Sequence, residues 1–171
     1  MKILFKNLAL LTIVISVFGC SSDSPTTTPT PTEVVKTKYT VTSVTITEMP
    51  FTKPNSIILW DGINNADVFM WMVYNNNNTV FAASTTFNNA TISNIPINWN
   101  FVTPYQTTNF SDSIYIWVWD DDVNDFPSAD DELIGIVPFN MTQYTIGSNK
   151  YPSSVTQSNV GVTIKLNLTW E

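Results

Sequence analysis

Alternation of apolar and polar residues with a period of two is the feature of this sequence that most constrains its fold. It is clearest at the C-terminus, where apolar residues recur at every second position over the last strand-like segment. These residues are Val160, Val162, Ile164, Leu166, Leu168 and Trp170. Successive side chains of a strand point to opposite sides, so such alternation predicts a β-strand with one buried face.

The strand pattern extends over most of the chain, and no segment shows a sustained period of 3.6 residues. Residues 113–119 are nearly all apolar, which predicts a central strand. Further strands are expected near residues 40–47, 67–74, 79–83, 96–102 and 133–139, between turn-rich pieces. About eight short strands predict an all-β domain, an antiparallel β-sandwich over residues 39–171.

The composition excludes several kinds of site. The chain of 171 residues has no His, no Arg and a single Cys, so it holds no Ser-His-Asp triad, no His-based zinc site and no internal disulfide. Its formal net charge is −7. This acidity argues against nucleic acid as a partner, because phosphate contacts need basic side chains.

The N-terminus has the features of a secretory signal. Two lysines lie within the first six residues, an apolar run extends from Leu8 to Phe18, and the small residue Gly19 precedes Cys20. Together these features are typical of a signal peptide. A small residue directly before a Cys resembles a bacterial lipobox, which implies a signal peptide over residues 1–19 and lipidation of Cys20.

The segment after Cys20 favours a lipid anchor. Residues 21–32 are rich in Ser, Thr and Pro, a composition that stays extended and does not pack, so residues 20–38 are predicted to be the anchor and its tether. A plain signal peptide and an uncleaved anchor are the alternatives, although the apolar run is shorter than the roughly 20 residues of a membrane span. We therefore expect a lipoprotein of the bacterial cell envelope, in the outer membrane.

Acidic residues are concentrated in two short segments. Nine of the 14 acidic residues lie there, neither segment contains a Lys, and the nearest Lys in sequence is Lys53. Two like charges about 4 Å apart near a protein surface repel by roughly 4 kcal/mol, and a bound divalent cation would remove that cost. The alternative is a solvated acidic loop that keeps the protein soluble. The acids are Asp61, Asp67, Asp120, Asp121, Asp122, Asp125, Asp130, Asp131 and Glu132.

Calcium is the cation that these side chains favour. Carboxylates are hard oxygen donors, and calcium accepts roughly six to eight oxygens in flexible loops. Zinc and copper would need His or Cys ligands, which this part of the chain lacks.

The two acidic segments frame the predicted strands in a regular order. Asp61 is followed after five residues by Asp67, which opens a strand. An apolar strand later ends in Asp120-Asp121-Asp122, and Asp131-Glu132 then precedes Leu133-Ile134-Gly135. This order resembles that of a C2 domain, the calcium- and phospholipid-binding β-sandwich, over residues 39–171. The resemblance implies a C2-like topology for the predicted sandwich.

The resemblance also implies metal ligands in two loops. Either Asp131 or Glu132 would be the last ligand of the second loop to reach the ion. The implied calcium ligands are Asp61, Asp67, Asp120, Asp122 and one of Asp131 and Glu132.

A membrane or surface partner follows from the same resemblance. In C2 domains calcium often bridges the loops to anionic phospholipid, and Ile63 and Phe126 would supply apolar contacts at the loop tips. For a chain already held on a membrane by lipid, a polysaccharide or a neighbouring protein is an equally plausible partner. The implied function is a membrane-anchored, non-catalytic calcium-binding module.

An EF-hand loop is an alternative for the second acidic segment. Asp120, Asp122, Asn124 and Asp131 have the spacing of such a loop. However, its sixth place is Asp125, where that loop needs Gly, and the flanking sequence predicts strands and not helices.

A carbohydrate-binding β-sandwich with structural calcium is the alternative function. Trp60 and Trp99 are the candidates for stacking on sugar, although core packing is favoured for each. Glycoside hydrolysis by paired carboxylates needs one acid with a raised pKa across a cleft. Nothing in the sequence sets such an acid apart from the cluster, so we predict no enzymatic activity.

Overall fold

The computed structural model describes residues 33–61, 64–74, 79–122 and 131–171. Residues Val34–Glu171 form one compact unit, which contains both sheets and the whole of the described core. A fragment of residues 34–171 therefore carries everything that the domain needs to fold. Among the described residues, no helix has the length and apolar character that crossing a membrane requires.

The described part of the unit contains eight strands and two short 3₁₀ helices. The 3₁₀ helices are η1 (Ile92–Asn94) and η2 (Met141–Thr145). The strands are β1 (Tyr39–Glu48), β2 (Val68–Tyr74), β3 (Val80–Ala83), β4 (Ile97–Thr107), β5 (Ser113–Asp120), β6 (Glu132–Asn140), β7 (Ser154–Asn159) and β8 (Val162–Trp170).

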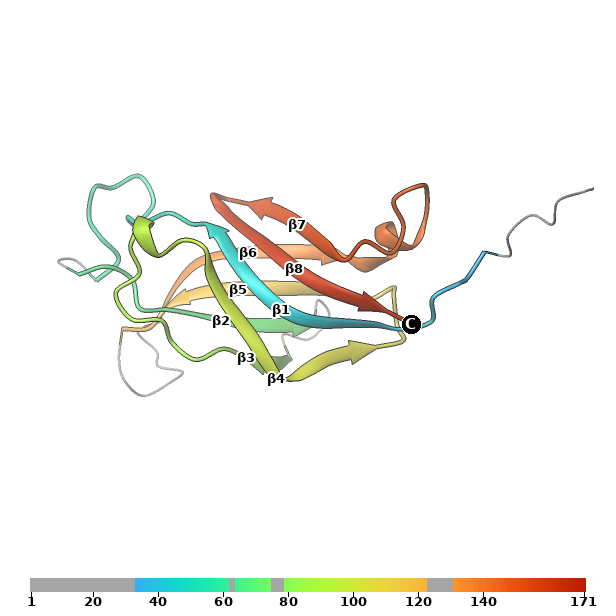
Figure 1. Ribbon diagram of the computed structural model, residues 1–171. Helices are drawn as coiled ribbons and strands as arrows, with labels where there is room; N and C mark the ends of the chain where they lie inside the picture. The colour runs from blue at the N-terminus through green and yellow to red at the C-terminus, as the bar shows by residue number, and fades with distance from the viewer. Residues whose placement is uncertain (1–32, 62–63, 75–78, 123–130) are drawn as a thin grey trace, which may run out of the picture. The chain divides into compact units, whose positions relative to one another are not determined.

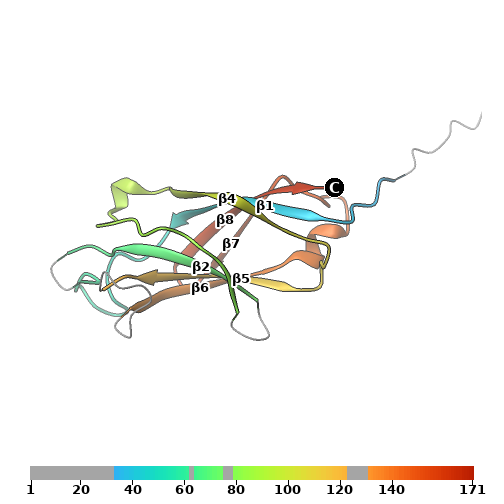
Figure 2. The same cartoon turned by 90° about the horizontal axis from the view of Figure 1, so that it is seen from below.

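The strands form two four-stranded sheets, with the orders β4-β1-β8-β7 and β3-β2-β5-β6. Every strand pair in both sheets is antiparallel. The sheets stack as two layers (Figure 1), and the view from below separates β1, β4 and β8 from β2, β5 and β6 (Figure 2). The predicted antiparallel β-sandwich of about eight strands is confirmed.

The inner faces of the sheets carry the residues that the alternation predicted. In β8, Ile164, Leu166 and Leu168 are buried, whereas Lys165 and Asn167 between them are not. The buried residues join one cluster with residues from the opposite sheet, so a single core holds both layers together.

The sequence pattern was wrong at the start of the last strand and missed the strand before it. Val160 is 80% exposed and has a φ of 46°, and Gly161 has a φ of 79°, so these two residues form the turn between β7 and β8. Two consecutive residues at positive φ are typical of a tight hairpin turn. The sequence pattern did not predict β7, because β7 is an edge strand whose only buried hydrophobic residue is Val155.

Strand β5 is apolar on both faces. Its core-facing residues Ile114, Ile116 and Val118 are fully buried. Trp117 and Trp119 alternate with them on the outer face of the sheet, where their rings lie 5.8 Å apart, centroid to centroid. The prediction of a central strand is confirmed, because β5 pairs with β2 on one side and β6 on the other.

Gly135 in β6 lies where the two sheets approach too closely for a side chain. A Cβ at this position would lie 2.7 Å from Cγ2 of Val162 in β8. We expect Gly135→Ala to lower the free energy of unfolding of fragment 34–171 by about 1–3 kcal/mol, the usual cost of overpacking a core. Urea unfolding at neutral pH measures the change.

Val162→Ala provides the matched control for this contact. It removes the methyl group that the new Cβ would meet, so the Gly135→Ala penalty should shrink in that background. An equal penalty in both backgrounds would show that the close approach to Val162 is not its cause.

Candidate metal centre

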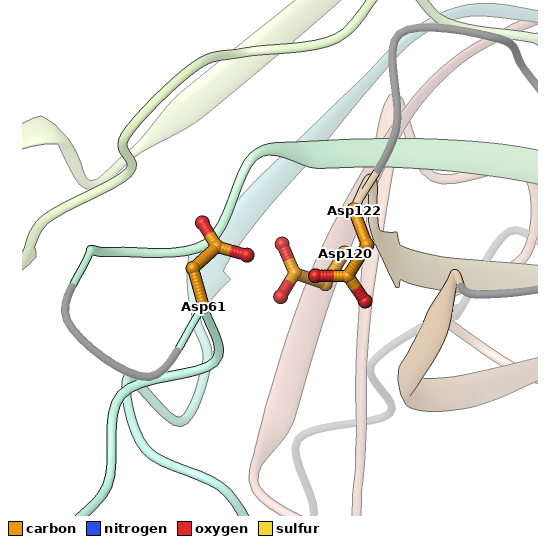
Figure 3. Close-up of side chains that lie close together, drawn as sticks. All are labelled: Asp61, Asp120 and Asp122. Carbon is orange, nitrogen blue, oxygen red and sulfur yellow. The ribbon is translucent and has the colours of Figure 1, made fainter.

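Three carboxylates from two separate loops meet at one end of the sandwich. One oxygen from each of Asp61, Asp120 and Asp122 lies within 4.8 Å of the other two. Asp120 is the last residue of β5, Asp122 follows it, and Asp61 lies in the connection from β1 to β2. Figure 3 shows Asp61 facing the other two from the opposite side. This end of β5 lies away from the C-terminus of the chain (Figure 1).

Asp120 occupies a core-facing position at the end of an apolar strand. It follows Ile116 and Val118 in the same register, and its side chain has no exposed surface. Asp120 pairs with Val68 across the sheet, and its Oδ1 accepts a hydrogen bond of 2.8 Å from the backbone N–H of Asp67. The backbone N–H of Asp121 donates in turn to the carbonyl of Asp67. The start of β2 and the end of β5 are therefore tied together at this carboxylate.

The second oxygen of Asp120 has no hydrogen-bond partner among the described residues. Oδ2 is buried, and nothing in the described part of the chain donates to it. Burial is the main cause that raises the pKa of Asp120 to about 7, and nearby Asp61 and Asp122 add to it, while the N–H of Asp67 acts in the opposite direction. A buried carboxylate with an orphaned oxygen is costly unless a cation or proton satisfies it.

Asp61 is positioned by the buried residue before it. Trp60 is only 3% exposed, and its indole N–H donates to the carbonyl of Pro50. An antiparallel bridge between Thr52 and Leu59 closes the hairpin that precedes this pair. The anchored indole and the hairpin together direct the Asp61 carboxylate toward the end of β5.

Asp122 shares the electrostatic environment of the other two carboxylates. Desolvation is the largest cause that raises its pKa to about 6, followed by a hydrogen bond with the side chain of Asp61 and by the charges of Asp61 and Glu132. For both Asp120 and Asp122, burial is the main cause of the raised pKa, and the negative charges of neighbouring carboxylates add to it.

Asp67 and Asp121 border the site and support its loops. They line a hollow of about 480 Å³ together with Asp61 and Asp122. Asp67 Oδ1 accepts a 2.6 Å bond from the N–H of Asn89, and Asp121 Oδ2 accepts from the hydroxyl of Thr86. Asp67 does not belong to the close group of three, so its role as a ligand stays a prediction.

Lys53 corrects the expectation that no basic side chain lies near the acids. Its ammonium group forms an ion pair with Glu132 at the start of β6, and Lys53 lines the same hollow as Asp61 and Asp122. The hydrogen bond to Glu132 is the main cause that raises the pKa of Lys53. Glu132, one of the two candidates for the last ligand, is therefore held by a cation of the protein itself. Asp131, the other candidate, is not part of the close group of three.

Several predicted residues lie outside the described part of the chain. They are the lipidation site Cys20 and the loop-tip residues Ile63 and Phe126. The described apolar tip is instead the hairpin that contains Lys53, where Ile57 is 96% exposed and Ile58 is 54% exposed. The sequence signal for this tip was present, because an apolar pair follows the turn-forming Pro54-Asn55.

The structure also bears on the EF-hand interpretation and on the two tryptophans named as candidates for stacking on sugar. Strands β5 and β6 flank the second acidic segment, and Asp61 joins the group from another loop, so the EF-hand interpretation is wrong. Trp60 is buried in the core and unable to stack on sugar. Trp99 is partly buried, packs against the core, and donates from its indole N–H to the carbonyl of Thr85.

The donor set fits a hard divalent cation. Three carboxylates converge, one of them with a buried oxygen that no described donor satisfies. Calcium tolerates irregular arrangements of carboxylate, carbonyl and water oxygens. The three side chains could therefore hold such an ion between Asp61 on one side and Asp120 and Asp122 on the other (Figure 3).

No protein-family model matches the chain, and no curated protein matches it by sequence. Similar solved structures exist. A human GIVD cytosolic phospholipase A2, in complex with a fluorophosphonate inhibitor and terbium chloride, is 9% identical with a TM-score of 0.48, and the match covers 78% of this chain and 17% of that one. The chain thus spans about a sixth of the phospholipase.

Two further similar structures are C2 domains by their descriptions. One, described as the structure of a C2 domain, is 11% identical with a TM-score of 0.45, and the match covers 78% of this chain and 97% of that one. A C2 domain of a plant extended synaptotagmin 1 is 9% identical with a TM-score of 0.43, at 78% and 92% coverage. At TM-scores below 0.5, neither the family nor the function of this chain rests on these similarities.

Proposed function

We propose that this protein is a non-catalytic, C2-like module that binds calcium through Asp61, Asp120 and Asp122. The observation that carries the proposal is the orphaned Oδ2 of Asp120, a fully buried carboxylate oxygen within reach of two other carboxylates. The C2-like order of the acidic segments supports it independently. A lipid on Cys20 would hold the module on a membrane of the bacterial cell envelope, in the outer membrane.

The unequal burial of the three acids supports a bound cation over a solvated acidic loop. A solvated loop would expose its carboxylates to water, as Asp122 is exposed. Asp120 instead lies in the core register of β5 with no exposed surface. Burying a charged carboxylate without a partner costs several kcal/mol, and the attraction of a divalent ion offsets this cost.

An anionic surface is the partner that the site favours. Ile57 and Ile58 form an exposed apolar tip on the hairpin that also carries Lys53, next to the acidic hollow. Calcium held by the acids could bridge to phosphate oxygens while the apolar tip enters the adjacent interface. Residues 20–33, the part of the predicted tether that precedes the compact unit beginning at Val34, would reach about 40 Å when extended, which allows contact with a phospholipid surface or a neighbouring polysaccharide or protein.

A carbohydrate-binding module is the second candidate function. Its sugar-binding surface would not be formed by Trp60 and Trp99, the residues expected from the sequence. Trp71, Trp117 and Trp119 gather on the outer face of the β3-β2-β5-β6 sheet, with ring centroids 5.3–6.5 Å apart. The outer face of the other sheet carries polar residues such as Lys165 and Asn167. Aromatic rings stack on sugars, and these three partly exposed tryptophans would supply the surface for that alternative.

Calcium should stabilise fragment 34–171 against thermal unfolding. A ligand that binds only the folded state stabilises it by mass action, by about 2.7 kcal/mol at 100 times the dissociation constant. Magnesium should stabilise it less, because it demands a regular octahedron and gives up its water reluctantly. Melting curves in chelator, in calcium and in magnesium measure the effect.

Asp61→Asn tests whether both loops build the site. The substitution keeps the size of the side chain and removes one anionic ligand, so the stabilisation by calcium should largely disappear. Asp112→Asn, at the opposite end of β5, is the matched control and should respond to calcium as the wild type does. Identical melting curves of the wild type in chelator and in millimolar calcium would reject the proposed function.

A further inference from the structure

Lys53 is the basic residue that the structure places at the acidic site. A backbone bond from its N–H to the carbonyl of Ile58, and one from Ser56 to its own carbonyl, fix the hairpin that carries it. Its ammonium group pairs with Glu132, which opens β6 directly opposite Asp120 of β5. The ion pair therefore lies between the hairpin and the strand end that presents the buried carboxylate.

The charge of Lys53 acts on the group of three acids as well as on Glu132. The negative charges of Asp122 and Asp120 contribute to the electrostatic environment of Lys53, which also lines the hollow beside Asp61. The Lys53 side chain keeps 35% of its surface exposed. A lysine has a flexible stem and a compact charge, so the ammonium group can rotate into water without moving the backbone.

We propose that Lys53 is the displaceable counter-ion of the cation-free site. A divalent cation expels its ammonium group and gains the Glu132 carboxylate as an additional ligand. The proposal rests on the proposed function, because it assumes that the cation binds at Asp61, Asp120 and Asp122. It adds a regulatory element, since Lys53 sets the calcium concentration at which the site fills.

Displacement follows from the charges at the site. A divalent ion among the three acids would repel the ammonium group and attract the carboxylate that this group holds. A monovalent ion offers the same single charge as the ammonium group and gains little by replacing it. Lys53 therefore lowers the affinity of the site for every cation. A divalent ion still gains more binding free energy at the site than a monovalent ion does.

Lys53→Met tests the proposal, because methionine is similar in length and uncharged. We expect fragment 34–171 with this substitution to bind calcium about tenfold more tightly, because a unit charge a few ångströms from a divalent ion repels it even in a water-like dielectric. In chelator the variant should melt at a lower temperature than the wild type, since the acids lose their counter-ion. Its rise in melting temperature on adding calcium should be larger.

Three further variants separate charge from structure. Lys53→Arg keeps the charge and should bind calcium within a few-fold of the wild type. Lys53→Gln removes the charge but keeps a donor for Glu132, and it should tighten binding as methionine does. Glu132→Gln in the Lys53→Met background should weaken binding about tenfold, because calcium then loses an anionic ligand.

Isothermal titration with calcium, alongside melting curves in chelator, distinguishes the outcomes. If the wild type binds calcium and neither neutral variant binds more tightly, Lys53 is not a counter-ion and only this proposal fails. If the wild type does not bind but the neutral variants do, Lys53 blocks the site and is not displaced by calcium, so both this proposal and the proposed function of the wild-type protein fail. If no variant binds calcium, the proposal fails together with the proposed function.

Discussion

In Asp120→Asn, calcium binding is expected to be lost while the cation-free domain becomes more stable at neutral pH. The substitution keeps an acceptor for the N–H of Asp67 and removes a charge that is fully buried. The pKa of Asp120 is raised from 3.8 to about 7. At about 1.4 kcal/mol for each tenfold change in proton affinity, ionising this carboxyl in the folded state costs up to about 4 kcal/mol.

Adding calcium should therefore reverse which of the two proteins, the wild type or Asp120→Asn, is the more stable. In chelator at pH 7.5, Asp120→Asn should have a higher free energy of unfolding than the wild type by as much as that amount. In saturating calcium the wild type should be the more stable of the two, because only it gains from binding.

Urea unfolding under both conditions measures the reversal. Asp112→Asn is again the control. The difference between its free energy of unfolding and that of the wild type should be the same in chelator and in calcium. A less stable Asp120→Asn in chelator would mean that the buried carboxylate stabilises the fold by itself, and that the structural reason for a cation is absent.

The stability of the cation-free domain should fall as pH rises from about 4 to about 7. Burial raises the pKa of Asp120 above its unfolded value, so the folded domain binds more protons than the unfolded chain in this range. The stability from protonated Asp120 is fully present below pH 3.8 and is lost as pH rises through about 7. Asp122, whose pKa is raised to about 6, acts in the same direction.

Calcium should invert this pH dependence, because protons and calcium compete for the same oxygens. Calcium affinity should rise between pH 5.5 and pH 7.5, and the calcium-bound domain should be most stable at the upper end. Unfolding free energies at several pH values, with and without chelator, provide the measurement. In chelator, Asp120→Asn should remove most of the dependence of the unfolding free energy on pH. A wild-type domain whose cation-free stability rises with pH over this range would contradict the assignment of a buried, partly protonated Asp120.

Much of the fold could be predicted from the sequence, because the alternation of apolar and polar residues indicates directly which face of a strand is buried. Residues such as Ile164 and Leu166 lie on the predicted face of β8 and within the shared core. β7 was missed because an edge strand with a single buried hydrophobic residue leaves little periodicity to detect. The start of β8 was misplaced because Val160 is apolar, although it occupies a turn at positive φ.

The site could be predicted in part. The resemblance to C2 domains predicted that Asp61 would lie near Asp120 and Asp122, and the structure places these three together. Whether they bind a metal stays a prediction. The core register of Ile116 and Val118 continues into Asp120, which explains why this acid is fully buried, whereas Asp122 lies beyond the end of β5 and is exposed.

The ion pair between Lys53 and Glu132 could not be predicted from the sequence. The two residues are far apart in the chain and meet only because the hairpin before Asp61 folds toward the start of β6. The basic charge at the site is therefore supplied by a residue whose distance along the chain does not indicate its position. Lys53, the nearest Lys in sequence, lies in the same hollow as the acids.

A crystal structure of fragment 34–171 grown in calcium, with the anomalous signal used to locate the ion, tests the central claim most directly. We expect one ion bound by oxygens of Asp61, Asp120 and Asp122 at distances of about 2.3–2.6 Å. Oδ2 of Asp120 should be among its ligands. A structure in which Asp120 keeps an unpartnered oxygen at millimolar calcium, with no ion between the two loops, would contradict the account.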